Sequence, residues 1–148
     1  MRTVVLVVLL VSGSAVAACD ETLSKVAGPT PNLEPTFSSV QKELFETTDV
    51  AGRVACTTCH TDVGRNASGG LNLRHDVAYD SLVNVPSRTK PGTFRVVPGD
   101  VESSYLVHKI EGRADIVGRR MPFSGPPFLT DGQILIVRRW IAIGAPRN

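Results

Sequence analysis

Two cysteines and a histidine stand close together near the middle of this sequence, in the run Cys56-Thr57-Thr58-Cys59-His60. The spacing C-x-x-C-H in an exported chain is typical of covalent haem attachment. Two thiols three positions apart on a turn can reach the two vinyl-derived carbons at one edge of a porphyrin, and the adjacent imidazole can then reach the iron. We therefore expect Cys56 and Cys59 to bind one haem c covalently, with His60 as the proximal ligand of its iron.

Other chemistries of a C-x-x-C pair fit the surrounding sequence less well. A thioredoxin-like redox pair needs a strand before it and a helix after it in a βαβ unit, and no such pattern surrounds residues 56–60. A structural zinc site needs four ligands from a closed set, and a chain with 3 cysteines has no second pair. The sequence therefore favours haem over a redox dithiol or zinc.

The sixth ligand of such an iron is sought among the methionines and the remaining histidines. The chain has 2 methionines, and loss of an N-terminal signal would remove Met1 and leave Met121 alone. Pro122 favours an extended backbone at the residue before it, which keeps that side chain out of a helical register. The competing ligands, His75 and His108, are both expected at the surface. We therefore expect Met121 to be the distal ligand; the alternative is a methionine that only packs in the core.

The N-terminal residues have the pattern of a secretion signal. Arg2 supplies a positive charge, residues 3–11 are almost entirely Val and Leu, and small residues lead up to Cys19. The apolar run is shorter than the roughly 20 residues of a membrane-spanning helix, and an uncleaved anchor is the alternative. The run 16–19, Val-Ala-Ala-Cys, resembles the lipobox of bacterial lipoproteins, which implies cleavage before Cys19 and its lipidation. An ordinary cleavage site beside an unmodified cysteine stays open as the alternative.

This pattern predicts an exported protein of the periplasm or cell envelope, anchored to the membrane through lipidated Cys19. Residues 1–18 would be the signal peptide. The three prolines of residues 19–35 favour an extended tether, although a tail packed on the domain is the alternative. Residues 36–148 have the length of a single domain.

The charge balance argues against a nucleic-acid partner. Without residues 1–18 the chain keeps 130 residues and a net charge of about +1, because the only charge lost is that of Arg2. Nucleic-acid-binding proteins concentrate far more positive charge than this. No nucleic-acid partner is therefore expected.

Three segments before the last helix have helical patterns or helix-start signals. Apolar residues at helical spacing predict an amphipathic helix over residues 37–47, ahead of the cysteines. Asp76 is expected to cap a short helix over residues 76–83. Asp100 follows a Pro-Gly turn and is expected to cap a further helix that ends at Gly112.

The last helix has the clearest boundaries. Thr130 and Gln133 have the spacing of a capping box, and Gly144 is expected to close the helix. Arg138 and Arg139 are expected on its solvated outer side. The residues expected to point inward are Ile134, Val137, Trp140 and Ile141. The predicted fold class is all-α, with three to five short helices and long loops around one covalently bound haem.

These features resemble those of class I cytochromes c, which have a helix leading into C-x-x-C-H, a late loop methionine and an aromatic-bearing last helix. The chain is most similar to planctomycete-type cytochrome c domains, over about residues 37–146. Besides residues 56–60, the matching stretches are Ser68-Gly69-Gly70-Leu71-Asn72-Leu73, Val97-Pro98-Gly99-Asp100, Ser104-Tyr105-Leu106, Arg120-Met121-Pro122, Leu129-Thr130-Asp131, Arg139-Trp140-Ile141 and Gly144-Ala145-Pro146. The resemblance implies that Cys56 and Cys59 bear the haem and that His60 and Met121 are its axial ligands.

The function that follows is single-electron transfer between redox partner proteins, whose identity the sequence does not give. With both axial positions filled, the iron has no open site for a substrate, and we expect an electron carrier instead of an enzyme. Two alternatives stay open. One is an open-site haem enzyme or gas sensor, which requires that Met121 is unbound. The other is a haem-containing interaction module of a larger oxidoreductase complex.

Overall fold

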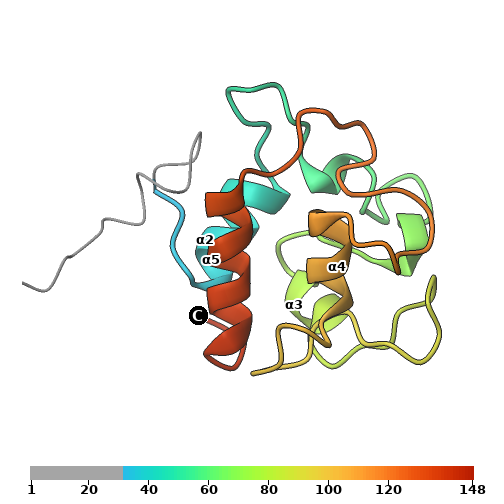
Figure 1. The fold of residues 1–148 in the computed structure, drawn as a ribbon. Helices are drawn as coiled ribbons and strands as arrows, with labels where there is room; N and C mark the ends of the chain where they lie inside the picture. Colours follow the sequence, from blue (N-terminus) through green and yellow to red (C-terminus); the bar gives the residue numbers. More distant parts are fainter. Residues whose placement is uncertain (1–31) are drawn as a thin grey trace, which may run out of the picture.

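The computed structural model describes residues 32–148 (Figure 1). The expected signal peptide, Cys19 and most of the expected tether lie outside these residues. All regular secondary structure of the described part is helical, apart from isolated β-bridges. This confirms the predicted all-α class. None of the helices in residues 32–148 is long and apolar enough to cross a membrane.

The first helix is short and changes its hydrogen-bonding pattern midway. Helix α2 covers Phe37–Val40, and a π-helix, η1, continues it over Gln41–Phe45. The Thr36 side chain caps α2 by accepting a hydrogen bond from the Ser39 amide at 3.2 Å. The helical region thus begins where the sequence predicts, and it ends shortly before the predicted residue 47. Phe37, Val40 and Leu44, which have helical spacing, are buried in the core.

The last helix, α5, covers Asp131–Ala142 and has the predicted capping box. The Thr130 hydroxyl accepts from the Gln133 amide at 3.2 Å, and the Gln133 side chain accepts from the Thr130 amide at 2.9 Å. The four apolar residues that were expected to point inward are all buried. The capping box and the inward face of this helix are therefore confirmed.

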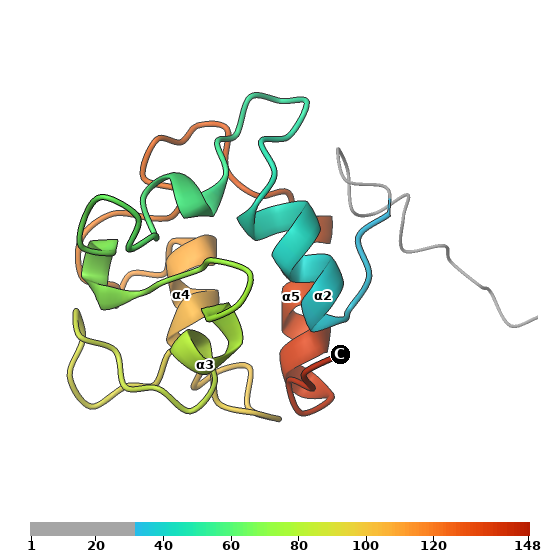
Figure 2. The ribbon, with the colours of Figure 1, turned by 180° about the vertical axis from the view of Figure 1, so that it is seen from behind.

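Helices α2 and α5 pack against each other along one side of the domain (Figures 1 and 2). The Phe37 ring lies 5.5 Å from the Trp140 ring, centroid to centroid, and 5.1 Å from the Tyr79 ring. Asn148 contacts α2 on the same side of the domain, where its backbone carbonyl accepts a hydrogen bond from the Ser38 amide at 2.8 Å. Its side-chain oxygen accepts from the Phe37 amide at 2.8 Å. The C-terminal residue thus satisfies two amides of the first turn of α2, which no helical partner can reach.

The two middle helices start later than the sequence suggests. Helix α3 covers Ala78–Leu82 without a side-chain cap, so the expected capping by Asp76 is wrong. Helix α4 covers Tyr105–Glu111 and begins after Ser104, so the expected capping by Asp100 is also wrong. The Asp100 carboxylate instead accepts a hydrogen bond from the Ser103 amide at 3.0 Å, because residues 100–103 still form a turn ahead of α4.

Gly112 ends α4 as predicted, with a positive φ of 74° that favours glycine. A side chain at this position would also collide with Arg120, whose Cδ would lie 2.7 Å from an added Cβ. The end of α4 is therefore held close to the loop that follows it. This loop carries the predicted distal ligand, Met121.

The buried core joins helices α2, α3, α4 and α5 of the described residues and begins ahead of the predicted domain boundary at residue 36. Leu33, within the expected tether, is 2% exposed and belongs to the core. The other large core residues are Phe37, Val40, Leu44, Phe45, Leu73, Leu82, Val96, Val107, Ile110, Leu129, Ile134, Ile136, Val137, Trp140 and Ile141. The packed part of the chain therefore includes at least the last residues of that segment.

Candidate functional site

The two cysteines and the histidine of the motif lie on one tight turn. A 3-10 helix, η2, covers Cys56–Thr58, and the Cys56 carbonyl accepts from the amides of Cys59 at 3.2 Å and His60 at 3.0 Å. Both cysteines are free thiols; Cys56 is half-buried and Cys59 is exposed. The turn therefore holds the backbones of the two cysteines and the histidine close together, with Cys56 packed against the core.

The core holds Cys56 through the end of η1. Its thiol donates a weak hydrogen bond to the Leu44 carbonyl at 3.5 Å, and the neighbouring Thr57 hydroxyl donates to the Phe45 carbonyl at 3.3 Å. Burial raises the pKa of the Cys56 thiol, and the positive charge of Arg53 opposes this rise. Burial thus favours the protonated form of this thiol, and the contacts with η1 hold Cys56 in place.

His60 is oriented by a backbone hydrogen bond. Its Nδ1 lies 3.0 Å from the Ser68 carbonyl oxygen, which can only accept, so Nδ1 carries the proton. Burial lowers the pKa of His60, which outweighs the opposite effect of the Ser68 and Leu71 carbonyls; the charges of Arg95 and Lys109 lower it further. A neutral imidazole that donates from Nδ1 offers Nε2 as the ligand nitrogen.

The loop that carries the Ser68 carbonyl is held in turn by a buried arginine. Arg95 donates from Nη2 to the Gly70 carbonyl at 2.9 Å and from Nη1 to the Ser81 carbonyl at 2.6 Å. The loop turns through Gly69 and Gly70, both with positive φ. Burial lowers the pKa of Arg95, and the charge of Arg88 lowers it further. Sequence reasoning missed Arg95, because its partners are backbone carbonyls from two distant segments.

Met121 lies half-buried in the loop between α4 and α5. In both views this loop runs past the turns η2 and η3, the latter covering Ser68–Gly70 (Figures 1 and 2). The Met121 amide donates to the Lys109 carbonyl at 2.8 Å. The charge of the same lysine contributes to the lowered pKa of His60. The Lys109 backbone therefore holds the segment that carries the predicted distal ligand against α4.

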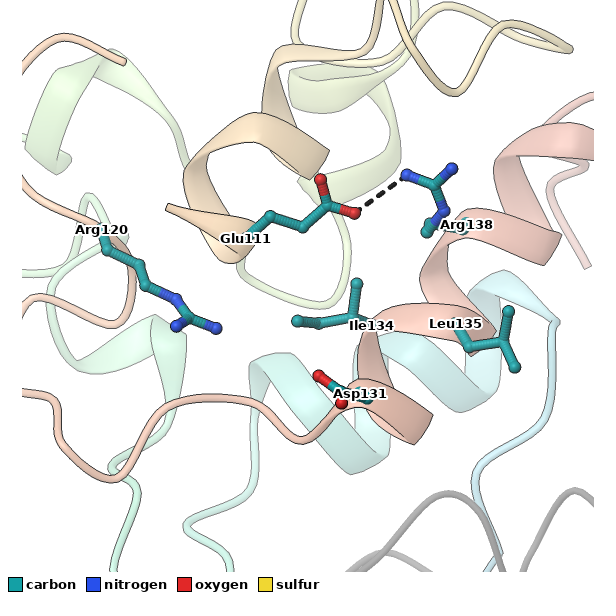
Figure 3. Close-up of a pocket in the computed structure, with 6 residues that line it drawn as sticks. All are labelled: Glu111, Arg120, Asp131, Ile134, Leu135 and Arg138. Carbon is teal, nitrogen blue, oxygen red and sulfur yellow. Dashed lines mark hydrogen bonds and ion pairs between the residues drawn. The ribbon is translucent and has the colours of Figure 1, made fainter. Parts of the chain in front are cut away.

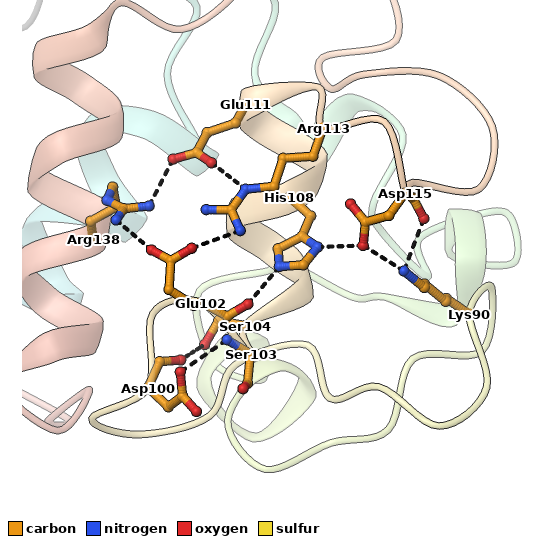
Figure 4. A network of polar contacts seen from close by, with 10 residues as sticks. All are labelled: Lys90, Asp100, Glu102, Ser103, Ser104, His108, Glu111, Arg113, Asp115 and Arg138. Carbon is orange, nitrogen blue, oxygen red and sulfur yellow. Dashed lines mark hydrogen bonds and ion pairs between the residues drawn. The ribbon is translucent and has the colours of Figure 1, made fainter.

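The two competing histidines are engaged elsewhere. His108 has its Nδ1 2.8 Å from Asp115 Oδ2 and its Nε2 2.7 Å from the Glu102 carbonyl, so both nitrogens already face oxygen atoms (Figure 4). His75 is exposed, with its Nδ1 3.4 Å from Glu46 Oε1. Neither of these histidines belongs to the turn that carries His60.

A group of charged side chains joins α4 to α5 (Figure 4). Arg138 pairs with Glu102 at 2.6 Å and with Glu111 at 2.9 Å, and Arg113 pairs with the same two carboxylates at 2.8 and 2.6 Å. Arg138, expected on the solvated outer side of the last helix, is part-exposed there and also forms ion pairs, because the loop before α4 brings Glu102 to it. The two partners of Arg138 lie 27 and 36 positions away in the sequence, so no local pattern points to them.

One surface hollow, with a volume of about 550 Å³, lies between α4 and α5 (Figure 3). Its lining residues are Glu111, Arg120, Asp131, Ile134, Leu135 and Arg138. None of the predicted site residues lines it, and the Glu111–Arg138 ion pair already spans part of it. The hollow therefore shows no relation to the cysteine turn.

Among residues 32–148, no group of three or more His, Cys, Asp or Glu side chains is placed to hold a metal ion. A comparison with protein-family models, curated proteins and solved structures finds no match for this chain. The site must therefore be interpreted from its own residues. Two free thiols on one turn, beside a histidine held by a backbone carbonyl, fit a covalently attached haem.

Proposed function

We propose that this protein is an exported, membrane-tethered c-type cytochrome that carries single electrons. The observation that carries the proposal is the turn at Cys56–Thr58, which presents two free thiols and is followed at once by a histidine oriented through Nδ1. The packing of α2 against α5 and the late loop methionine agree with the class I cytochrome c fold that the sequence resembles. The haem iron, when bound, supplies the one-electron chemistry.

The residues of the turn have separate roles in this proposal. Cys56 and Cys59 would hold the haem through two thioether bonds; addition of an S–H across a vinyl group would need no oxidant, because sulfur bonds to one carbon and hydrogen to the other. His60 is the proximal ligand through Nε2, and the Ser68 carbonyl keeps its ring in place. Met121 is the distal ligand. With both residues as ligands, the haem iron would have no open position for a substrate, which favours simple electron transfer.

The apolar surroundings of the turn suit a buried cofactor edge. Leu71, whose carbonyl acts on His60, is partly buried against the core, as is Cys56 itself. Leu73 is buried, and its amide donates to the His60 carbonyl at 2.8 Å. Side chains of this kind exclude water from a haem, and low water access together with thioether ligation raises the reduction potential.

The proposed location follows from the N-terminal sequence alone. Cleavage before Cys19 and lipidation of its thiol would hold the domain at a membrane of the cell envelope, where redox partner proteins exchange electrons with it. Mass spectrometry of the mature N-terminus tests this part. A lipid-modified Cys19 is expected, and an intact Met1 or an unmodified Cys19 would refute it.

Covalent haem attachment is the decisive test of the function. The protein is expressed together with a cytochrome c maturation system, denatured and separated by electrophoresis, and the gel is stained for haem. Thioether bonds survive denaturation, so the wild type should stain. Cys56→Ala and Cys59→Ala should each weaken the stain, and the double variant should lose it. Loss of haem from the wild-type protein on denaturation would refute the proposal.

A further inference from the structure

The loop after α4 is hydrogen-bonded back onto that helix at several points. The Val117 amide donates to the Tyr105 hydroxyl at 2.8 Å, and Arg120 Nε donates to the Ile110 carbonyl at 2.8 Å. The Met121 amide donates to the Lys109 carbonyl at 2.8 Å. Helix α4 is therefore the platform on which the segment 117–121 rests.

Lys109 makes more of these contacts than any other residue of this platform. Its Nζ donates to the Val117 carbonyl at 2.9 Å and to the Arg119 carbonyl at 2.5 Å, in addition to the bond from its own carbonyl to the Met121 amide. One residue thus holds the chain at three points within five positions. Two of these bonds come from a charged donor, and such bonds are about twice as strong as neutral ones.

The Lys109 ammonium has no carboxylate partner among the described residues, and its stem is half-buried. Lys42, by contrast, has a side chain that is 78% exposed and lies beside Glu43. The two loop carbonyls are what compensates the charge of Lys109.

We propose that Lys109 is a positioning residue that holds the segment 117–121 so that the Met121 thioether stays at the iron. This inference rests on the proposed function, since it needs Met121 as the distal ligand. An iron–thioether bond is weak, and a loop that moves freely would lose it. The hydrogen bonds from Lys109 already restrict the conformations of residues 117–121. Less conformational entropy is therefore lost each time the Met121 thioether binds the iron.

The experiment uses the haem-loaded protein and compares Lys109→Leu with Lys42→Leu, which removes the same charge from an exposed position. Lys109→Arg keeps a charged donor and should restore most of the effect. If Lys109→Leu does not fold, Lys109→Gln removes the charge and keeps a shorter polar side chain. Three properties are measured: the sulfur-to-iron charge-transfer band, the rate of cyanide binding, and hydrogen exchange in the peptide that contains residues 113–125.

In Lys109→Leu we expect cyanide to bind about tenfold faster, which corresponds to the net loss of roughly one hydrogen bond to a charged group. The band should disappear at a lower temperature, and exchange in residues 113–125 should be faster. Lys42→Leu should behave like the wild type. If the wild type shows the band and Lys109→Leu matches it in all three measurements, the inference is overturned while Met121 ligation stands. If the wild type lacks the band and binds cyanide at once, Met121 ligation itself is overturned, and the inference with it.

Discussion

Arg53 Nε lies 3.0 Å from Asp49 Oδ2, in an ion pair whose side chains are 0% and 2% exposed. Asp49 also accepts from the Arg53 amide at 3.0 Å, and Arg53 Nη1 donates to the Leu44 carbonyl at 3.2 Å. The pair therefore closes the loop between η1 and η2 directly ahead of Cys56. Arg53 Nη2 is buried without a hydrogen-bond partner among the described residues, so the charge depends heavily on Asp49.

Asp49→Asn should destabilise the protein strongly. Removing one partner of a buried ion pair leaves the other charge uncompensated, which costs about 3–5 kcal/mol in the free energy of unfolding. Urea unfolding of the haem-loaded protein measures this. Asp80→Asn is the matched control, because Asp80 pairs with Arg147 at an exposed position and should cost less than about 1 kcal/mol. Equal losses in the two variants would contradict the structural role of Asp49.

Met121→Ala should open the iron to small ligands. The sulfur-to-iron band of the oxidised protein should disappear, carbon monoxide should bind to the reduced form, and the reduction potential should fall. Spectroscopic titration and potentiometry measure these changes, while haem staining should stay as in the wild type. If the wild type already binds carbon monoxide readily, the open-site haem enzyme or gas sensor becomes the better hypothesis.

Arg95→Gln should lower the reduction potential. A positive charge beside the proximal ligand favours the reduced iron, and its removal should cost on the order of tens of millivolts at the effective dielectric of a protein interior. Arg65→Gln is the control, because Arg65 is exposed. Potentiometry measures the reduction potentials of the wild type, Arg95→Gln and Arg65→Gln. If the reduction potential falls equally in both variants, the effect comes from the net charge of the protein and not from the position of Arg95.

The stability contributed by Asp115 should depend on pH. Hydrogen bonds from Lys90, at 2.6 Å, and from His108 lower the pKa of the Asp115 carboxyl from its ordinary 3.8 to about 2. A lowered carboxyl pKa stabilises the fold above the ordinary value, and this contribution is lost as the pH falls towards the lowered value. The wild type should therefore melt at a higher temperature than Asp115→Asn at pH 5–6, where the difference is largest. This difference should shrink between about pH 4 and pH 2. A difference that grows as the pH falls would contradict this assignment.

Features that depend on a few neighbouring residues could be predicted well. The capping box at Thr130 and Gln133 forms as expected, because both of its hydrogen bonds lie within one helical turn. Gly112 ends α4 because only glycine readily takes the positive φ that closes the helix. Where two local patterns compete, prediction fails: Asp100 serves the turn before α4 instead of capping the helix.

The sequence by itself determined that Cys56, Cys59 and His60 lie close together, since they are at most four positions apart in the chain whatever surrounds them. It also determined that Met121 is the one methionine beyond the expected signal peptide, because this is a matter of composition. Only the tertiary structure decided which groups hold these residues. The Ser68 carbonyl reaches His60, and Lys109 reaches the segment of Met121, through contacts with backbone carbonyls. Every residue has a carbonyl, so no residue type marks such a partner, and only the folded path of the chain selects it.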